Sequence, residues 1–195
     1  LIGGRSPEAV ARFFAEDAET QMLDLLDAGV TTVQSGGDDN QGIQELKRMI
    51  DNGEIKGPRI ITSYSVPSAR MSSETEVRMA VRAAVEAGAD SIAEVHYPDV
   101  VWPFAPSTQE TKNLIAGLDE AQKLGIPFQI HAVSDVSLAA TVAMGAQKLI
   151  HSVNINWVTD EQAEQVAASG AQVASITGFG SPNFGVFSQD NEPKF

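Results

Sequence analysis

The chain has 195 residues, with 13 Lys and Arg against 26 Asp and Glu, and it has no cysteine. The lack of cysteine excludes disulfides, thiolate zinc sites and cysteine nucleophiles. The net charge of −13 argues against nucleic acid and anionic membranes as partners, because both are polyanions. The 43% of apolar residues is enough for one globular domain, and no apolar run reaches the roughly 18 to 20 residues that cross a bilayer.

One pattern recurs along the chain: an amphipathic stretch ends in glycine, and a β-branched run follows at once. Glycine closes a helix in the left-handed conformation, after which the chain turns into a strand. The pattern predicts, in chain order, a helix over 7–27, a strand over 30–35, a helix over 41–51, a strand over 59–65, a helix over 74–87, a strand over 90–97, a helix over 108–124, a strand over 127–133, a helix over 135–144, a strand over 148–153, a helix over 160–169 and a strand over 171–177.

Polar residues mark the starts of several of these helices. Ser6 precedes Pro7 and Glu8, which is the order of an N-cap, a first-turn proline and an early acid. Three further caps have a Glu or Gln three residues later and predict capping boxes: Ser73 with Glu76, Ser107 with Glu110, and Thr159 with Gln162.

Strict alternation of strand and helix predicts a parallel sheet with right-handed crossovers. Two architectures remain open: a six-stranded doubly wound sheet, or a (β/α)8 TIM-barrel type of which about six βα units are present. Eight such units need about 250 residues. The second reading makes residues 1–195 a single partial barrel domain with an irregular loop or tail over 180–195. The start at Leu1, without methionine, predicts a chain cut from a longer one.

All three histidines fall at the predicted C-terminal ends of strands: His96, His131 and His151. In both architectures this edge of the sheet carries the chemistry. Two imidazoles from adjacent strands can converge on one cation, so His131 and His151 are candidate metal ligands. The alternative is that each is a hydrogen-bonded core histidine.

Strand periodicity adds Glu94 to the candidates. Side chains alternate between faces, so Ile92, Glu94 and His96 are expected on one face and Ala93, Val95 and Tyr97 on the other. The apolar set suits the helix-covered face, which directs Glu94 and His96 toward the mouth. The alternative is that Glu94 pairs with a buried base on a neighbouring strand.

The connection after residue 97 is the longest and carries aromatic residues. Tyr97, Trp102 and Phe104, stiffened by prolines, are candidate substrate-binding residues. They equally suit packing over the rim of the sheet. Ser35-Gly36-Gly37 lacks the spacing of a phosphate loop and favours a plain turn, and no nucleophile elbow or Walker motif is present.

Four stretches, taken together, resemble the metal-dependent amidohydrolase superfamily in its imidazolonepropionase-like and prolidase-like branch. They are Leu25 to Val33, which resembles the approach to the family's second strand; Ile50 to Ile60, with the glycine-proline-arginine start of the third; Ala121 to Ala132, with the fifth strand and its metal histidine; and Gly145 to His151, with the sixth strand and its own metal histidine.

The resemblance implies a hydrolase of C–N bonds in an amide, a cyclic amide or a dipeptide, acting through metal-activated water. It implies zinc or another divalent metal, as one or two ions, held by His131 and His151 with Glu94 as ligand or bridge. Glu94 and His96 are the implied catalytic residues, with His96 orienting a small-molecule substrate. The family's first-strand His-x-His pair would lie just before Leu1. Asp190 does not fit the family's eighth-strand aspartate, and Ala93 stands where many members have a carboxylated lysine.

Two rival functions stay open at this point. One is a non-catalytic barrel fragment, whose exposed parallel edges favour association and hence a homo-oligomer. The other is a doubly wound domain that binds a small molecule and uses the histidines structurally. The compartment is also open, between cytoplasm and periplasm.

Overall fold

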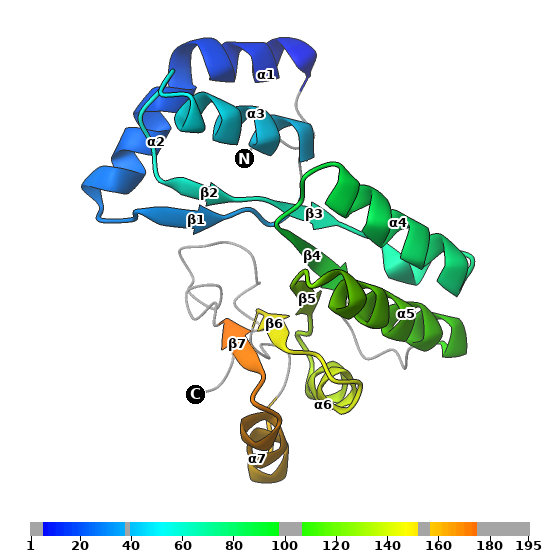
Figure 1. Ribbon diagram of the computed structural model, residues 1–195. Coiled ribbons are helices and arrows are strands. Elements are labelled where there is room, and N and C mark those ends of the chain that lie inside the picture. Colours follow the sequence, from blue (N-terminus) through cyan, green and yellow to red (C-terminus); the bar gives the residue numbers. More distant parts are fainter. Residues whose placement is uncertain (1–5, 38–39, 98–106, 152–156, 175–195) are drawn as a thin grey trace.

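The computed structural model describes residues 6–37, 40–97, 107–151 and 157–174. Its helices and strands alternate along the chain, and the strands follow an arc with the helices outside it (Figure 1). The elements are α1 (Pro7–Arg12), a π-helical segment (Phe13–Asp17), α2 (Ala18–Asp27), β1 (Thr32–Gln34), α3 (Asn40–Asp51), β2 (Arg59–Ile61), β3 (Ser63–Ser65), a 3-10 turn (Ser68–Arg70), α4 (Glu74–Glu86), β4 (Ser91–His96), α5 (Thr108–Leu124), β5 (Phe128–His131), α6 (Asp135–Ala143), β6 (Lys148–Ile150), α7 (Asp160–Ser169) and β7 (Gln172–Ala174).

Every strand pair in the described chain is parallel, and the strands lie in sequence order. One sheet has the order β1-β2 and the other β3-β4-β5-β6-β7. A doubly wound sheet reverses its strand order at a switch point, and no such reversal occurs among the described strands. The doubly wound alternative is therefore wrong, and the chain has the sequential βα order of a TIM-barrel type fold. None of the helices in the described ranges is both long and apolar enough to cross a membrane.

The predicted elements are present, with three changes. The helix expected over 7–27 contains the π-helical segment Phe13–Asp17. The strand expected over 59–65 is divided at Thr62 into β2, which pairs with β1, and β3, which pairs with β4. The strand expected over 148–153 ends at Ile150, because the next residue, His151, has a φ of 64° and leaves the extended region. The tail expected over 180–195 lies outside the described residues.

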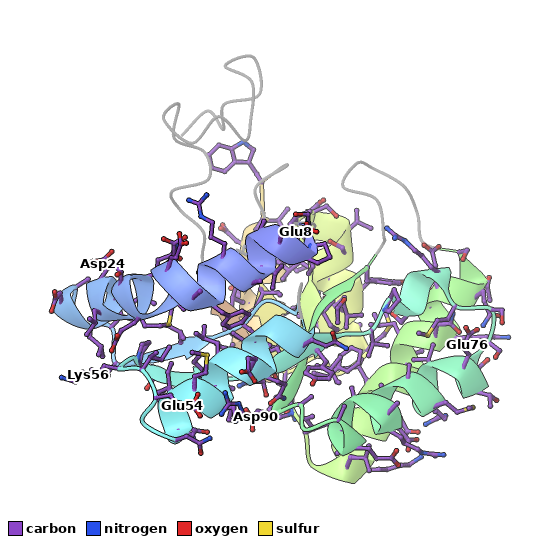
Figure 2. The ribbon with its side chains drawn as sticks, turned by 90° about the horizontal axis from the view of Figure 1, so that it is seen from above. Glu8, Asp24, Glu54, Lys56, Glu76 and Asp90 are labelled. Atoms are coloured by element: carbon purple, nitrogen blue, oxygen red, sulfur yellow. The ribbon has the colours of Figure 1, made fainter. Side chains whose placement is uncertain are left out.

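The predicted caps form, with one exception. Ser107 and Thr159 make full capping boxes with Glu110 and Gln162. Ser73 accepts from the backbone N–H of Glu76, but the Glu76 carboxylate accepts from the N–H and hydroxyl of Ser72 instead of closing the box. These bonds, the hydroxyl's first, lower the pKa of Glu76. Of the charged residues labelled in Figure 2, Glu8, Asp24 and Glu76 are exposed on helices.

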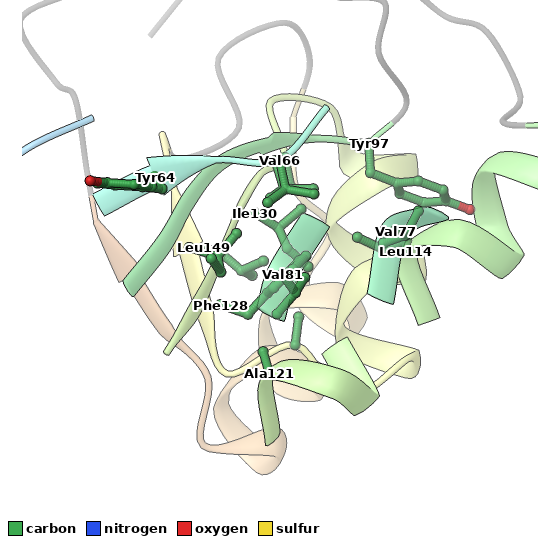
Figure 3. Packing of buried hydrophobic residues seen from close by; sticks show 14 of the residues in the cluster. Tyr64, Val66, Val77, Val81, Tyr97, Leu114, Ala121, Phe128, Ile130 and Leu149 are labelled. Atoms are coloured by element: carbon green, nitrogen blue, oxygen red, sulfur yellow. The ribbon is translucent and has the colours of Figure 1, made fainter. Parts of the chain in front are cut away.

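Two apolar clusters hold the helices against the strands. The larger, drawn in Figure 3, lies between β3–β6 and helices α4–α6, and includes Val81, Ile92, Leu114, Ile130 and Leu149. The smaller joins the N-terminal helices to β2 through Phe13, Ala18, Met22, Leu46 and Ile60. Burial of apolar surface on one side of the strands leaves the opposite side, the inner face, for polar groups.

The carboxylate of Asp90 hydrogen-bonds to Thr62, the residue between β2 and β3. Its Oδ2 accepts from the Thr62 N–H at 2.8 Å, from the Thr62 hydroxyl at 2.9 Å and from Lys47 Nζ at 2.8 Å. Burial acts to raise the pKa of Asp90, but the hydrogen bonds from Lys47 and Thr62 outweigh it and the pKa is lowered. Asp90 therefore ties α3, on Lys47, to the point where one strand passes from one sheet to the other.

A second set of charges joins α4 to α5. Arg82 Nε lies 2.6 Å from Glu120 Oε1, and Arg78 contacts both Glu120 and Asp119. The Glu120 side chain is only 5% exposed, and the hydrogen bond from Arg82 is the first of the contacts that lower its pKa. The two guanidinium groups offset the cost of removing this carboxylate from water.

Gly37, in the turn after β1, lies directly against the backbone of β3. Its φ is +97°, and a Cβ built on it would approach the backbone nitrogen of Ser65 to 2.9 Å. The neighbouring Ser35 hydroxyl accepts from the Ser63 N–H at 2.8 Å and donates to the Ser63 carbonyl at 3.3 Å. The Ser35-Gly36-Gly37 turn therefore joins β1 to β3.

We expect Gly37→Ala to destabilise the fold more than Gly53→Ala. Both residues have positive φ, but the space around Gly53 is open. The left-handed conformation costs an alanine about 1 to 2 kcal/mol at either site, and overpacking against β3 adds about 1 to 3 kcal/mol at Gly37 alone. Urea unfolding measures the difference, and equal losses for the two variants would contradict the close approach.

We expect Asp90→Asn to lower the free energy of unfolding near pH 7 by about 1 kcal/mol. This is less than the usual contribution of hydrogen bonds to a charged group, because the carboxylate is partly exposed to solvent. The Asp90 side chain is 42% exposed. A lowered folded-state pKa gives stability that is present above the unfolded-state value and lost as the pH falls through the folded-state value. The gap between wild type and variant should thus close below about pH 4. Asp24→Asn, on an exposed face of α2, is the control and should change the free energy of unfolding by less than about 0.5 kcal/mol.

Candidate functional site

His131 and His151 meet at the C-terminal ends of two adjacent strands. His131 ends β5 and is in register with Ile150, the last residue of β6, so His151 lies one residue beyond. The two imidazole rings lie edge to face, with centroids 4.5 Å apart and planes at 74°. Both side chains are half-buried, and the Nδ1 atoms are shielded from solvent.

The packing shows which face of β5 carries His131. Phe128, Ile130 and Ala132 belong to the cluster under the helices. Gln129 and His131 alternate with them and therefore lie on the inner face. The sequence order apolar, polar, apolar, His, apolar thus fixes the side of the sheet on which the imidazole lies.

The prediction for β4 is partly wrong. Ile92 was expected opposite Val95 and Tyr97, yet all three belong to the helix-facing cluster. The reason is a register shift between Ile92 and Val95, where β4 holds one residue more than β5. Glu94 lies within this shift, and His96 is in register with His131. The side chains of Glu94 and His96 are outside what the structure describes, so their roles stay predictions.

The aromatic residues predicted to bind substrate are placed only in part. Tyr97 is 3% exposed, in the helix-facing cluster, and its hydroxyl lies 3.0 Å from the Thr111 hydroxyl on α5. This placement corresponds to the packing alternative for Tyr97. Trp102 and Phe104 fall in 98–106, outside the described residues.

A polar belt that the sequence reasoning missed crosses the inner face below the histidines. Gln34 Nε2 donates to the hydroxyls of Ser63 at 3.0 Å and Ser91 at 2.9 Å, and these two hydroxyls lie 2.6 Å apart. Gln129 Nε2 donates to Ser91 at 3.4 Å. The belt joins β1, β3, β4 and β5, and Gln129 is two residues before His131. The signal was a polar residue at the inward position of successive strands.

The two histidines fit a divalent ion of the kind that imidazole prefers. Two ring nitrogens from adjacent strand ends supply half of a four-ligand zinc site, and imidazole also suits copper, nickel and iron. Within the described residues no group of three or more His, Asp or Glu side chains lies close enough to hold an ion. Glu94 and His96 on β4 stay the predicted further residues of this site.

Known structures with a similar fold include several hydrolases. An amidohydrolase is 25% identical with a TM-score of 0.66, over 86% of this chain and 47% of that one. A prolidase complexed with N-methylphosphonate-L-proline is 19% identical with a TM-score of 0.69, over 95% and 52%. Phenylurea hydrolase B is 20% identical with a TM-score of 0.67, over 88% and 48%.

The chain spans about half the length of these structures. No curated protein matches its sequence. The model of the amidohydrolase family matches residues 8–172, which covers every strand and helix from α1 to β6 and α7 apart from Pro7, and reaches the first residue of β7. With the sequential parallel strands and the paired histidines, this match shows that the chain belongs to the amidohydrolase family.

Proposed function

We propose that this protein is a metal-dependent hydrolase of C–N bonds, in which His131 and His151 hold a divalent ion. The observation that carries the proposal is the pair of imidazole rings, 4.5 Å apart at the ends of adjacent parallel strands. Membership of the amidohydrolase family supports it. A bound zinc ion would lower the pKa of a coordinated water toward neutrality and polarise the scissile carbonyl.

The remaining roles follow from the strand ends. His96 is level with His131 on the neighbouring strand, which suits it to orient the substrate. Glu94, in the register shift, is the proposed further ligand or bridge and the acid–base partner. Trp102 and Phe104 stay the proposed substrate contacts on the loop after β4. One or two ions are compatible with this set.

The substrate we propose is a small amide, cyclic amide, dipeptide or urea. A prolidase and a phenylurea hydrolase among the similar structures support this range by their names. The net charge of −13 disfavours nucleic acid as a partner. We propose that a small molecule is the physiological ligand.

We expect zinc to bind stoichiometrically to protein prepared without metal. His131→Ala and His151→Ala should each weaken zinc binding by at least about 10- to 100-fold, because even substitutions of residues that only hydrogen-bond to metal ligands cause a loss of that size. Calorimetry with Zn²⁺ alone measures the affinity. Gln122→Ala, at an exposed position of α5, is the control and should leave binding unchanged.

Hydrolysis of dipeptides, cyclic amides and phenylureas should follow metal loading and disappear in both histidine variants. The proposal fails if the protein binds no stoichiometric metal and both histidine variants keep the wild-type stability and the wild-type zinc titration. The protein would then be a non-catalytic member of the family. Circular dichroism of each variant separates loss of the ion from loss of the fold.

A further inference from the structure

We propose that the left-handed backbone at His151 is a positioning device, which turns its imidazole from the helix-facing side of β6 onto His131 before any ion binds. The inference rests on the proposed function, because the paired rings would coordinate the proposed ion. It concerns a property of the chain itself, which can be measured without metal.

Strand alternation alone would send His151 to the wrong side. Leu149 is 1% exposed and packs in the cluster under the helices, so Lys148 and Ile150 lie on the inner face. If β6 continued in the extended conformation, His151 would follow Leu149 to the helix side. His131 lies on the inner face, so the two rings would then be separated by the sheet.

The backbone breaks the alternation at this residue. His151 has a φ of 64°, and it is the only non-glycine residue with positive φ among those the structure describes. Strand β6 ends at Ile150, and the imidazole contacts the ring of His131 edge to face at 4.5 Å. Register, burial, dihedral angle and ring contact thus agree on one cause for the pairing.

This conformation is unfavourable for a residue with a Cβ. Glycine adopts it freely, whereas other residues in it are strained and are found mainly where the surrounding structure imposes it, often at functional sites. A glycine at position 151 would relieve the strain but remove the ligand. The chain keeps the strained histidine, and the gain is that the two imidazoles lie next to each other on one side of the strands.

The test is the order of stability of glycine and alanine at this position. Both His151→Gly and His151→Ala lose the ring, so their difference reports the backbone. We expect His151→Gly to melt about 2 to 8 °C above His151→Ala in the presence of a chelator, the shift expected for relief of a left-handed alanine in a chain of this size. Both variants lack the imidazole and should lose zinc affinity to a similar extent, by at least about 10- to 100-fold, so a difference between their melting temperatures does not come from zinc binding.

His131 provides the matched control, because it is a histidine of the same pair in an ordinary strand. There glycine only adds backbone freedom, so His131→Gly should melt below His131→Ala. The same order at both positions, with alanine more stable than glycine, would overturn the inference.

Ring-to-ring contact in solution is measured separately. The chain has only three histidines, so their ring protons can be assigned by NMR with the single variants. We expect a nuclear Overhauser contact between His131 and His151 in chelator-treated protein, and its absence would overturn the inference. Zinc titration of the wild type tests the proposed function and not the positioning of His151. If no zinc binds, but His151→Gly still melts above His151→Ala and the two rings are still in contact, the positioning role is supported and the metal role is wrong.

Discussion

The structure depends on the burial of apolar side chains on one side of the parallel strands. Ile92, Ile130 and Leu149, on three adjacent strands, are each at most 1% exposed and share a single cluster with the helices. Their burial fixes which side of each strand faces outward, because a slip of one residue would expose the whole set. The alternate positions then form the inner face, and the positions of Gln129 and His131 follow from it.

The two ends of the strands have different roles. At the N-terminal end, Asp90 accepts hydrogen bonds from Thr62 and Lys47. At the C-terminal end, His131 and His151 bring two ring systems together. This is the division common to TIM-barrel folds, in which one end stabilises and the other carries chemistry.

Much of the fold and part of the site could be predicted from the sequence. Glycines after amphipathic stretches gave the helix ends, and the spacing of His131 and His151 placed both at strand ends. The shift within β4 could not be predicted, because an extra residue changes no local pattern and is visible only against the partner strand. The φ of His151 had no signal either, since strand patterning indicates extended backbone. The polar belt could not be predicted, because a single serine in a strand gives no signal. Only the pairing of β3 with β4 shows that the Ser63 and Ser91 hydroxyls are in contact.

The break at Thr62 has a consequence for how the molecule opens. One strand serves two sheets, and each half has its own apolar cluster. Gln34 Nε2 donates to the Ser63 hydroxyl and the Ser63 N–H donates to the Ser35 hydroxyl, and these bonds cross between the halves. Such contacts are individually weak, so we expect the N-terminal half, with its smaller cluster, to open first and to exchange its amide hydrogens sooner than the strands around the histidines. The histidine-bearing strands would then belong to the more slowly exchanging part of the chain.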